Sequence, residues 1–354
     1  MASRNIHLVT LRRYAFYLIL LALTIATVLL ALYTLRHEKP VPAALDLAAS
    51  TAAPADPVGV APTRAPIALG ASLHLSAAPP AVLARGWGAG GCTVAPFLDL
   101  SADGGAHWAA LPQPARDISA LAFISGEVGV VAGYDERCTP ALWRTSTGGS
   151  SWLPVPGVTG AVSAVEPTRD GALWLIHGGR VARAGPGSPL VPVAADPCAR
   201  GSVGPARLLS AVSVSRAWVV CAVGAGAGGQ RRLLYGTSDA GARWTELAGA
   251  RTVPSTGRVD GLDGDGSVAA LQFVDAATGT ALVVTASCPS GALRRSADGG
   301  RTWRAVACLP AEALTSRARP RFLDAQVGYL ALPGAGTGRT LRTRDGGRTW
   351  AATG

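Results

Sequence analysis

The eight residues SADGGAHW, at positions 101–108, recur along the chain and decide its fold. The pattern common to the copies is Ser or Thr, any residue, Asp, any residue, Gly, any two residues and Trp. We call each copy a box. Three further clear copies read TSDAGARW, SADGGRTW and TRDGGRTW, at positions 237–244, 296–303 and 343–350.

Two other segments follow the pattern less closely. TSTGGSSW at 145–152 has Thr147 at the Asp position. RAGPGSPL at 183–190 is a degenerate copy that has Leu190 at the Trp position. With both included, the boxes repeat with a period of about 48 residues, which indicates a repeat architecture.

Each residue type in a box suits a tight hairpin. Glycine accepts positive φ at little steric cost, and the Asp carboxylate and Ser or Thr hydroxyl accept hydrogen bonds from backbone N–H groups of the turn. The Trp indole is expected to pack against neighbouring strands. We therefore assign a structural role to Ser101, Asp103, Gly105, Trp108, Thr145, Gly149, Trp152, Thr237, Asp239, Gly241, Trp244, Ser296, Asp298, Gly300, Trp303, Thr343, Asp345, Gly347 and Trp350.

Short apolar segments surround each box and predict four strands per repeat. Two of them precede the box as a pair joined by a polar turn, as in ALAFISGEVGVVAG at 120–133. A third strand leads into the box and a short fourth strand follows it. A four-stranded unit of this period predicts an all-β propeller of six blades. Seven blades are the alternative, if the N-terminal segment supplies further strands.

The chain ends soon after Trp350, so the last strand is expected to be very short. We therefore expect a strand from around Ile67–Leu75 to help close the ring.

The boxes resemble the Asp-box, or BNR repeat, of sialidase-like and sortilin-like propellers. The strand pairs ahead of the boxes, with their FxDxxxG pattern, also resemble photosystem II assembly factors of the Ycf48 type. The resemblance covers residues 67–354 and implies a β-propeller with its boxes on the periphery, away from the ligand-binding face. The fold hosts enzymes, receptors and scaffolds, so the resemblance does not by itself assign a function.

The catalytic residues of sialidases do not map onto this sequence. The resemblance implies that a catalytic sialidase would carry a Phe/Tyr-Arg-Ile-Pro motif, three arginines that bind a carboxylate, a Tyr–Glu nucleophile pair and an Asp acid. The chain has no such motif, and beyond position 67 its tyrosines are Tyr134, Tyr235 and Tyr329. We therefore name no catalytic residue and expect a binding or assembly scaffold. A sialidase-like glycoside hydrolase is the alternative.

The N-terminal segment predicts a membrane anchor. Residues 14–35 carry no charge, and a helix of that length would span roughly 33 Å, slightly more than a bilayer core. Residues 1–13 carry positive charge and are expected in the cytoplasm. Residues 36–66 are rich in Pro and Ala and predict a tether, which leaves the propeller (67–354) outside the cytoplasm. A cleaved signal peptide is the alternative.

Six cysteines follow the anchor, an even number that suggests disulfides in an extracytoplasmic domain. The expected blade positions favour three pairs formed in sequence order, and buried free thiols are the alternative. The pairs are Cys92 with Cys138, Cys198 with Cys221, and Cys288 with Cys308.

The formal charge of +10 comes almost entirely from scattered arginines, with Lys39 the only lysine, so the sequence does not indicate a nucleic-acid partner. The acidic segment at 260–266 fits a solvated turn better than a calcium site, since it lacks EF-hand spacing. His74, His107 and His177 are dispersed. We expect no metal and no cofactor; a sensor of calcium or a small ligand is a further alternative. The expected partners are the membrane and a protein or glycan.

Overall fold

The computed structural model describes residues 72–88, 92, 97–199, 203–226, 229–249, 262, 267–316, 319–332 and 338–353. The expected cytoplasmic tail (1–13), anchor (14–35) and tether (36–66) lie outside these residues. Among the residues that are described, no helix has the length and apolar character needed to cross a membrane.

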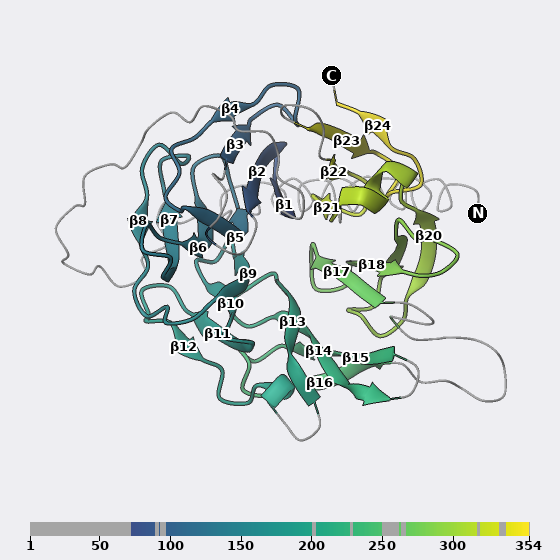
Figure 1. Cartoon of the computed structure of the whole chain (residues 1–354). Coiled ribbons are helices and arrows are strands. Elements are labelled where there is room, and N and C mark those ends of the chain that lie inside the picture. The colour runs from purple at the N-terminus through teal and green to yellow at the C-terminus, as the bar shows by residue number, and fades with distance from the viewer. Residues whose placement is uncertain are drawn as a thin grey trace, which may run out of the picture. The chain divides into compact units, whose positions relative to one another are not determined.

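Six sheets, each made of four consecutive antiparallel strands, are arranged around a common centre (Figure 1). We call each sheet a blade and number the blades in chain order. The described part of the chain is therefore a six-bladed β-propeller, and the resemblance to Asp-box propellers is confirmed at the level of the fold.

The first three blades comprise β1 to β12. Blade 1 contains β1 (Ser72–Ala78), β2 (Val82–Gly88), β3 (Phe97–Ser101) and β4 (Ala109–Ala110). Blade 2 contains β5 (Asp117–Phe123), β6 (Gly129–Tyr134), β7 (Pro140–Thr145) and β8 (Leu153–Pro154). Blade 3 contains β9 (Val162–Pro167), β10 (Leu173–His177), β11 (Arg180–Ala184) and β12 (Val191–Pro192).

The last three blades comprise β13 to β24. Blade 4 contains β13 (Val203–Ala211), β14 (Ala217–Gly226), β15 (Gly229–Thr237) and β16 (Thr245–Gly249). Blade 5 contains β17 (Ser267–Phe273), β18 (Gly279–Val284), β19 (Ala292–Ser296) and β20 (Arg304–Cys308). Blade 6 contains β21 (Arg321–Phe322), β22 (Gly328–Leu332), β23 (Arg339–Thr343) and β24 (Ala351–Ala352). Two short 3-10 helices, η1 (Pro197–Ala199) and η2 (Ala311–Ser316), lie between blades.

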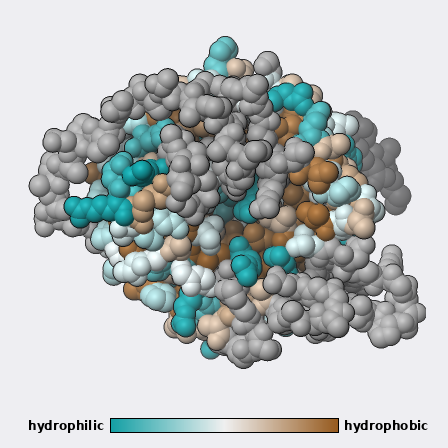
Figure 2. Space-filling view, viewed as in Figure 1, coloured by the Kyte–Doolittle hydropathy of each residue, from teal (hydrophilic) through white to brown (hydrophobic). Residues whose placement is uncertain are grey.

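The core lies between neighbouring blades. The second strand of a blade, such as β6 or β22, is buried along nearly its whole length, since both faces of the sheet are covered by the adjacent blades. One apolar cluster, for example, joins Val130 and Leu142 of blade 2 to Val165 and Leu175 of blade 3. The fourth strands β4, β8, β12 and β24 are two residues long and exposed or nearly so. Figure 2 shows that the described surface in this view mixes hydrophobic and hydrophilic residues.

The ring closes differently from the sequence expectation. The described part of the region around Ile67–Leu75, residues 72–75, belongs to β1. This strand pairs with β2 inside blade 1 and not with the last blade, whose fourth strand is β24. The prediction of a borrowed strand was therefore wrong, because a two-residue β24 is enough to complete its sheet. Side chains hold the seam instead: Leu73 and Leu83 of blade 1 pack with Tyr329 of blade 6. The Thr353 hydroxyl donates a hydrogen bond to the carbonyl oxygen of Gly105 at 3.2 Å.

The propeller has two different faces. On one, which we call the box face, each of the five boxes of blades 1, 2, 4, 5 and 6 hydrogen-bonds to the turn between that blade's first and second strands. The N–H of Gly299, for example, donates to the carbonyl of Ala277 at 2.9 Å, and that of Gly346 to Gln326 at 2.8 Å. The opposite face, the loop face, carries the loops between second and third strands and the connections between blades.

Candidate functional site

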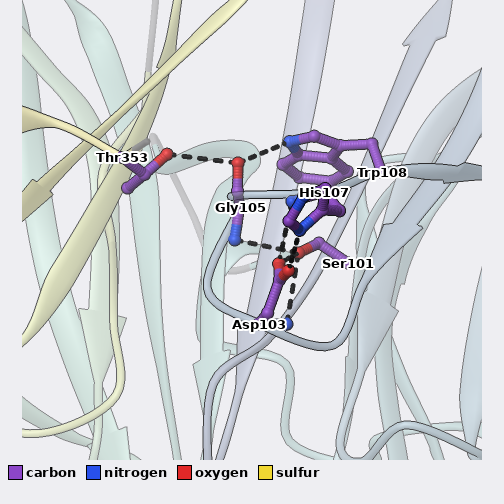
Figure 3. Close-up of polar contacts among 6 residues, drawn as sticks. All are labelled: Ser101, Asp103, Gly105, His107, Trp108 and Thr353. Carbon is purple, nitrogen blue, oxygen red and sulfur yellow. Dashed lines mark hydrogen bonds and ion pairs between the residues drawn. The ribbon is translucent and has the colours of Figure 1, made fainter.

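The first box shows how the recurrent residues are used (Figure 3). The Ser101 hydroxyl accepts a hydrogen bond from the N–H of Gly105 at 2.8 Å and donates one to Asp103 Oδ1 at 2.8 Å. The same carboxylate oxygen accepts the N–H of His107 at 3.0 Å. The Trp108 indole N–H donates to the Gly105 carbonyl at 3.0 Å. Hydrogen bonds from His107 and Ser101 lower the pKa of Asp103. Its carboxylate therefore stays ionised and accepts hydrogen bonds within the turn.

The hydrogen bond between the first hydroxyl of the box and the N–H of its second glycine recurs in the other four boxes, whereas the indole bond to that glycine recurs at Trp303. Glycine N–H to hydroxyl distances are 2.9, 3.0, 2.8 and 2.8 Å for Gly149, Gly241, Gly300 and Gly347. In the box with Thr147 at the Asp position, the Thr147 hydroxyl accepts the N–H of Ser151 at 3.0 Å. The degenerate segment lies between β11 and β12, and Leu190 packs against the core there. The boxes are hairpins, and their carboxylates point into their own turns.

The two glycine positions of a box have different requirements. The first position has φ between 65° and 76° in four boxes, and blade 4 places Ala240 there with φ of 62°. The second position is glycine in all five boxes, with φ from 82° to 98°. A Cβ on Gly300 would lie 3.0 Å from Leu234 and 3.1 Å from Phe273. The second glycine is therefore required by both backbone and packing.

This difference predicts unequal costs for two neighbouring substitutions. Gly300→Ala is expected to lower the free energy of unfolding by about 2–4 kcal/mol, through left-handed backbone strain and overpacking. Gly299→Ala is expected to cost at least about 1 kcal/mol less. The only neighbour from outside the box that a Cβ on Gly299 would contact is the Ala276 carbonyl oxygen, at 3.1 Å. Urea unfolding of both variants measures the difference. Equal losses would contradict the assignment.

The three disulfides pair Cys92 with Cys138, Cys198 with Cys221, and Cys288 with Cys308, which are the pairs that the sequence analysis expects. All three lie toward the loop face. The first joins the loop after β2 to the loop after β6 and so links neighbouring blades. The second joins η1 to β14, and the third joins the loop after β18 to the end of β20. Each disulfide therefore fixes loops or connections of one face of the propeller.

The central channel holds a group of charged residues that sequence analysis did not single out. A cavity of about 60 Å³, room for a few water molecules, is lined by the first strands of all six blades. Its charged and titratable lining residues are His74, Glu166, Arg207, Arg319 and Arg321. The residues come from strands far apart in the chain, so no local motif marks them.

Arg321 links three blades across the channel. Arg321 of β21 lies with Nη1 3.3 Å from Oε1 of Glu166 on β9, and its Nε donates to the carbonyl of Leu75 on β1 at 3.2 Å. The Glu166 side chain is 15% exposed. Burial raises the pKa of Glu166, and Arg321 opposes that shift. The pair ties opposite sides of the ring together.

His74 faces the same channel from β1. Burial, with the charges of Arg319 and Arg321, lowers the pKa of His74 from 6.5 to about 4, while Asp117 opposes the shift. His74 is therefore neutral in the folded protein at pH values where the unfolded chain binds a proton.

This shift predicts acid sensitivity. Since the unfolded chain binds the proton more tightly, the free energy of unfolding should fall as the pH decreases from about 6.5 to about 4. His74→Gln should remove on the order of 2 kcal/mol of the loss between pH 7 and pH 4.5. Urea unfolding of both proteins at the two pH values measures it, and the box carboxylates cancel in the difference. Parallel pH profiles for the two proteins would refute the prediction.

The three tyrosines of the propeller lie away from the channel lining. Tyr134 ends β6, Tyr235 is in β15 and Tyr329 is in β22, so they belong to second or third strands. Tyr329 is completely buried in the seam between blades 6 and 1. The described channel lining thus includes one glutamate and three arginines without a tyrosine.

Metal ligands are not gathered in the part of the chain that the structure describes: no three His, Cys, Asp or Glu side chains lie close enough there to hold an ion. Of the acidic segment at 260–266, only Leu262 is described. His107 is in the first box, and His177 Nε2 accepts the N–H of Thr159 at 3.1 Å.

No family model and no curated protein matches the chain. Solved structures with some similarity include YCF48 from Cyanidioschyzon merolae (15% identity, 81% of this chain and 87% of that chain, TM-score 0.45). Others are a Hadza microbial sialidase (15%, 80% and 65%, TM-score 0.47) and an Aleuria aurantia lectin bound to a fucoside (10%, 80% and 95%, TM-score 0.47). At these values they carry no argument about function.

Proposed function

We propose that this chain is a non-catalytic binding or assembly scaffold, anchored in the membrane by residues 14–35, which carries a protein or glycan partner on its loop face outside the cytoplasm. The observation that carries the proposal is the placement of all three disulfides toward one face. Loops fixed before binding lose less conformational entropy when a partner binds, so a pre-organised loop face suits recognition.

The same disulfides support the compartment in this proposal. Structural disulfides persist in oxidising surroundings, and three of them in one domain support a location outside the cytoplasm. The uncharged segment 14–35 supports membrane attachment. Fractionation tests this part: the full chain should stay with membranes after a high-salt wash, whereas a variant that lacks residues 1–35 should not. Release of the full chain by salt would contradict the anchor.

Site-specific photo-crosslinking tests the loop face. A photoreactive residue at Arg137, exposed in the loop between β6 and β7, should crosslink a defined partner in intact cells. The matched control carries the same residue at Ser150, exposed in the box of the same blade on the opposite face. Crosslinking from Ser150 alone would place the partner on the box face and contradict the proposal. The absence of a crosslink from both sites in blade 2 and from the equivalent sites in other blades would refute the scaffold function.

The alternative is a glycoside hydrolase, which the group of Glu166 and three arginines in the channel favours. The raised pKa of Glu166 would suit a general acid. The positions of the tyrosines oppose a sialidase-like Tyr–Glu nucleophile pair. A fluorogenic sialoside separates the two functions: the scaffold predicts no turnover, whereas turnover that is lost in Glu166→Gln would establish the hydrolase.

A further inference from the structure

A groove on the loop face lies away from the propeller axis. Its volume is about 520 Å³, far larger than that of the channel cavity. The groove lies over the start of β17, between β13 of blade 4 and the segment that leads into β21 of blade 6. Its outer side is formed by η2 and the loop between β18 and β19.

The inner end of this groove is positively charged. Arg207 and Arg319 line both the groove and the central channel, so they lie where the two meet, and both are exposed. Arg232 lines the groove from blade 4, and its Nη2 donates to the Ser267 hydroxyl at 3.0 Å, which orients the guanidinium. The described lining includes no Asp or Glu side chain. The charge therefore favours an anionic group at this end.

The remainder of the groove is apolar. Leu314 is 53% exposed and Val284 is 39% exposed, and they are two of the four large hydrophobic residues that are exposed among the described residues. Val268, Leu282 and Pro289 also belong to this apolar lining. Removing such side chains from water favours a ligand with an apolar body. Aromatic rings, on which sugars stack, do not occur in the described lining.

We propose that this groove binds an amphiphilic anion, with a carboxylate or phosphate head at Arg207 and Arg319 and a hydrocarbon chain along Val284 and Leu314. The head would accept charge-assisted hydrogen bonds from the guanidinium groups, and the chain would cover the exposed leucine and valine. The groove lies on the loop face, but binding of a small amphiphile there does not depend on the scaffold function.

Calorimetric titration of the purified propeller with decanoate tests the proposal. Decanoate should bind at least about tenfold more tightly than decanol, which lacks the charge, and than acetate, which lacks the chain. Decyltrimethylammonium, which has the chain with the opposite charge, should bind most weakly of the chain-bearing probes. Equal affinity for decanoate and decanol, or no binding of decanoate, would overturn the proposal without affecting the crosslinking test of the scaffold.

Two pairs of variants locate the site. Arg207→Gln should weaken decanoate binding about tenfold, whereas Arg180→Gln, at an exposed arginine of blade 3 on the same face, should not change it. Leu314→Ser should weaken binding, whereas Leu153→Ser, at a leucine of similar exposure (48%) on an outer strand, should not. These exposed positions are not in the core, and a thermal unfolding scan checks that each variant folds. Unchanged binding in Arg207→Gln would overturn the assignment.

A last arm distinguishes a free amphiphile from a membrane lipid. Vesicles that contain phosphatidylglycerol are offered to the propeller without its anchor, with and without decanoate. Vesicle binding that decanoate and Arg207→Gln both abolish would identify a lipid headgroup as the source. Decanoate binding without vesicle binding would identify a free amphiphile. If vesicles prevent decanoate binding but bind equally well to Arg207→Gln, the groove is not the lipid-binding site, which would count against the proposal.

Discussion

Asp99→Ala is expected to lower the free energy of unfolding by about 3–5 kcal/mol, because it removes the carboxylate that compensates a buried arginine charge. Nε and Nη2 of Arg85 donate to Oδ2 of Asp99 at 3.0 and 2.9 Å, and the two side chains are 2% and 1% exposed. The guanidinium also lies 4.0 Å from the centre of the Trp108 ring. Denaturant unfolding of the variant and the parent protein measures the loss.

A surface ion pair provides the matched control. Arg339 and Glu312 are 2.7 Å apart but 53% and 59% exposed, so Glu312→Ala is expected to cost less than about 1 kcal/mol. The double replacement Arg85→Met with Asp99→Leu should recover most of the stability, since it removes both charges together. A loss in Asp99→Ala no larger than that in Glu312→Ala would show that the buried pair does not stabilise blade 1.

Trp303→Ala is expected to cost about 3–5 kcal/mol, since it empties the best-buried site among the box tryptophans. Trp303 is 9% exposed, packs edge-on against Phe273 with ring centres 6.0 Å apart, and belongs to the core between blades 4 and 5. Its indole N–H donates to the Gly300 carbonyl at 3.0 Å. Thermal and denaturant unfolding should both shift.

Conversion to Phe isolates the indole hydrogen bond. Trp303→Phe should cost about 1 kcal/mol more than Trp244→Phe, because the Trp244 N–H is buried without a hydrogen-bond partner in the described structure. Equal costs at the two positions would mean that ring size alone, and not the bond to Gly300, determines the stability of the box.

The boxes were predictable because their bonds are local. Ser101, Asp103 and Gly105 interact within one turn, so eight consecutive residues contain the hydrogen bonds that shape the turn. Four strands per repeat follow from the same spacing. The cysteine pairs could be predicted for a related reason. Once the blades are assigned along the sequence, the two cysteines of each pair lie in the same blade or in adjacent blades.

The channel and the ring seam were not predictable in this way. Glu166 and Arg321 are 155 residues apart, and their meeting depends on the closure of the whole ring. First strands differ between blades at the positions that face the axis, so repetition gives no signal there. Arg85 and Asp99 are likewise particular to blade 1. The seam was misjudged because strand length does not reveal whether side chains such as Tyr329 can hold two blades together.

Each of the six described blades is built from strands that follow one another in the chain, and none of these strands is exchanged between the first and last blades. During synthesis from the N-terminus, the chain can therefore complete one sheet after another before blade 6 is made. The contacts that join blade 6 to blade 1, such as those of Tyr329 and Thr353, form last. Joining the two ends and opening the chain between any other two blades should thus preserve all six sheets.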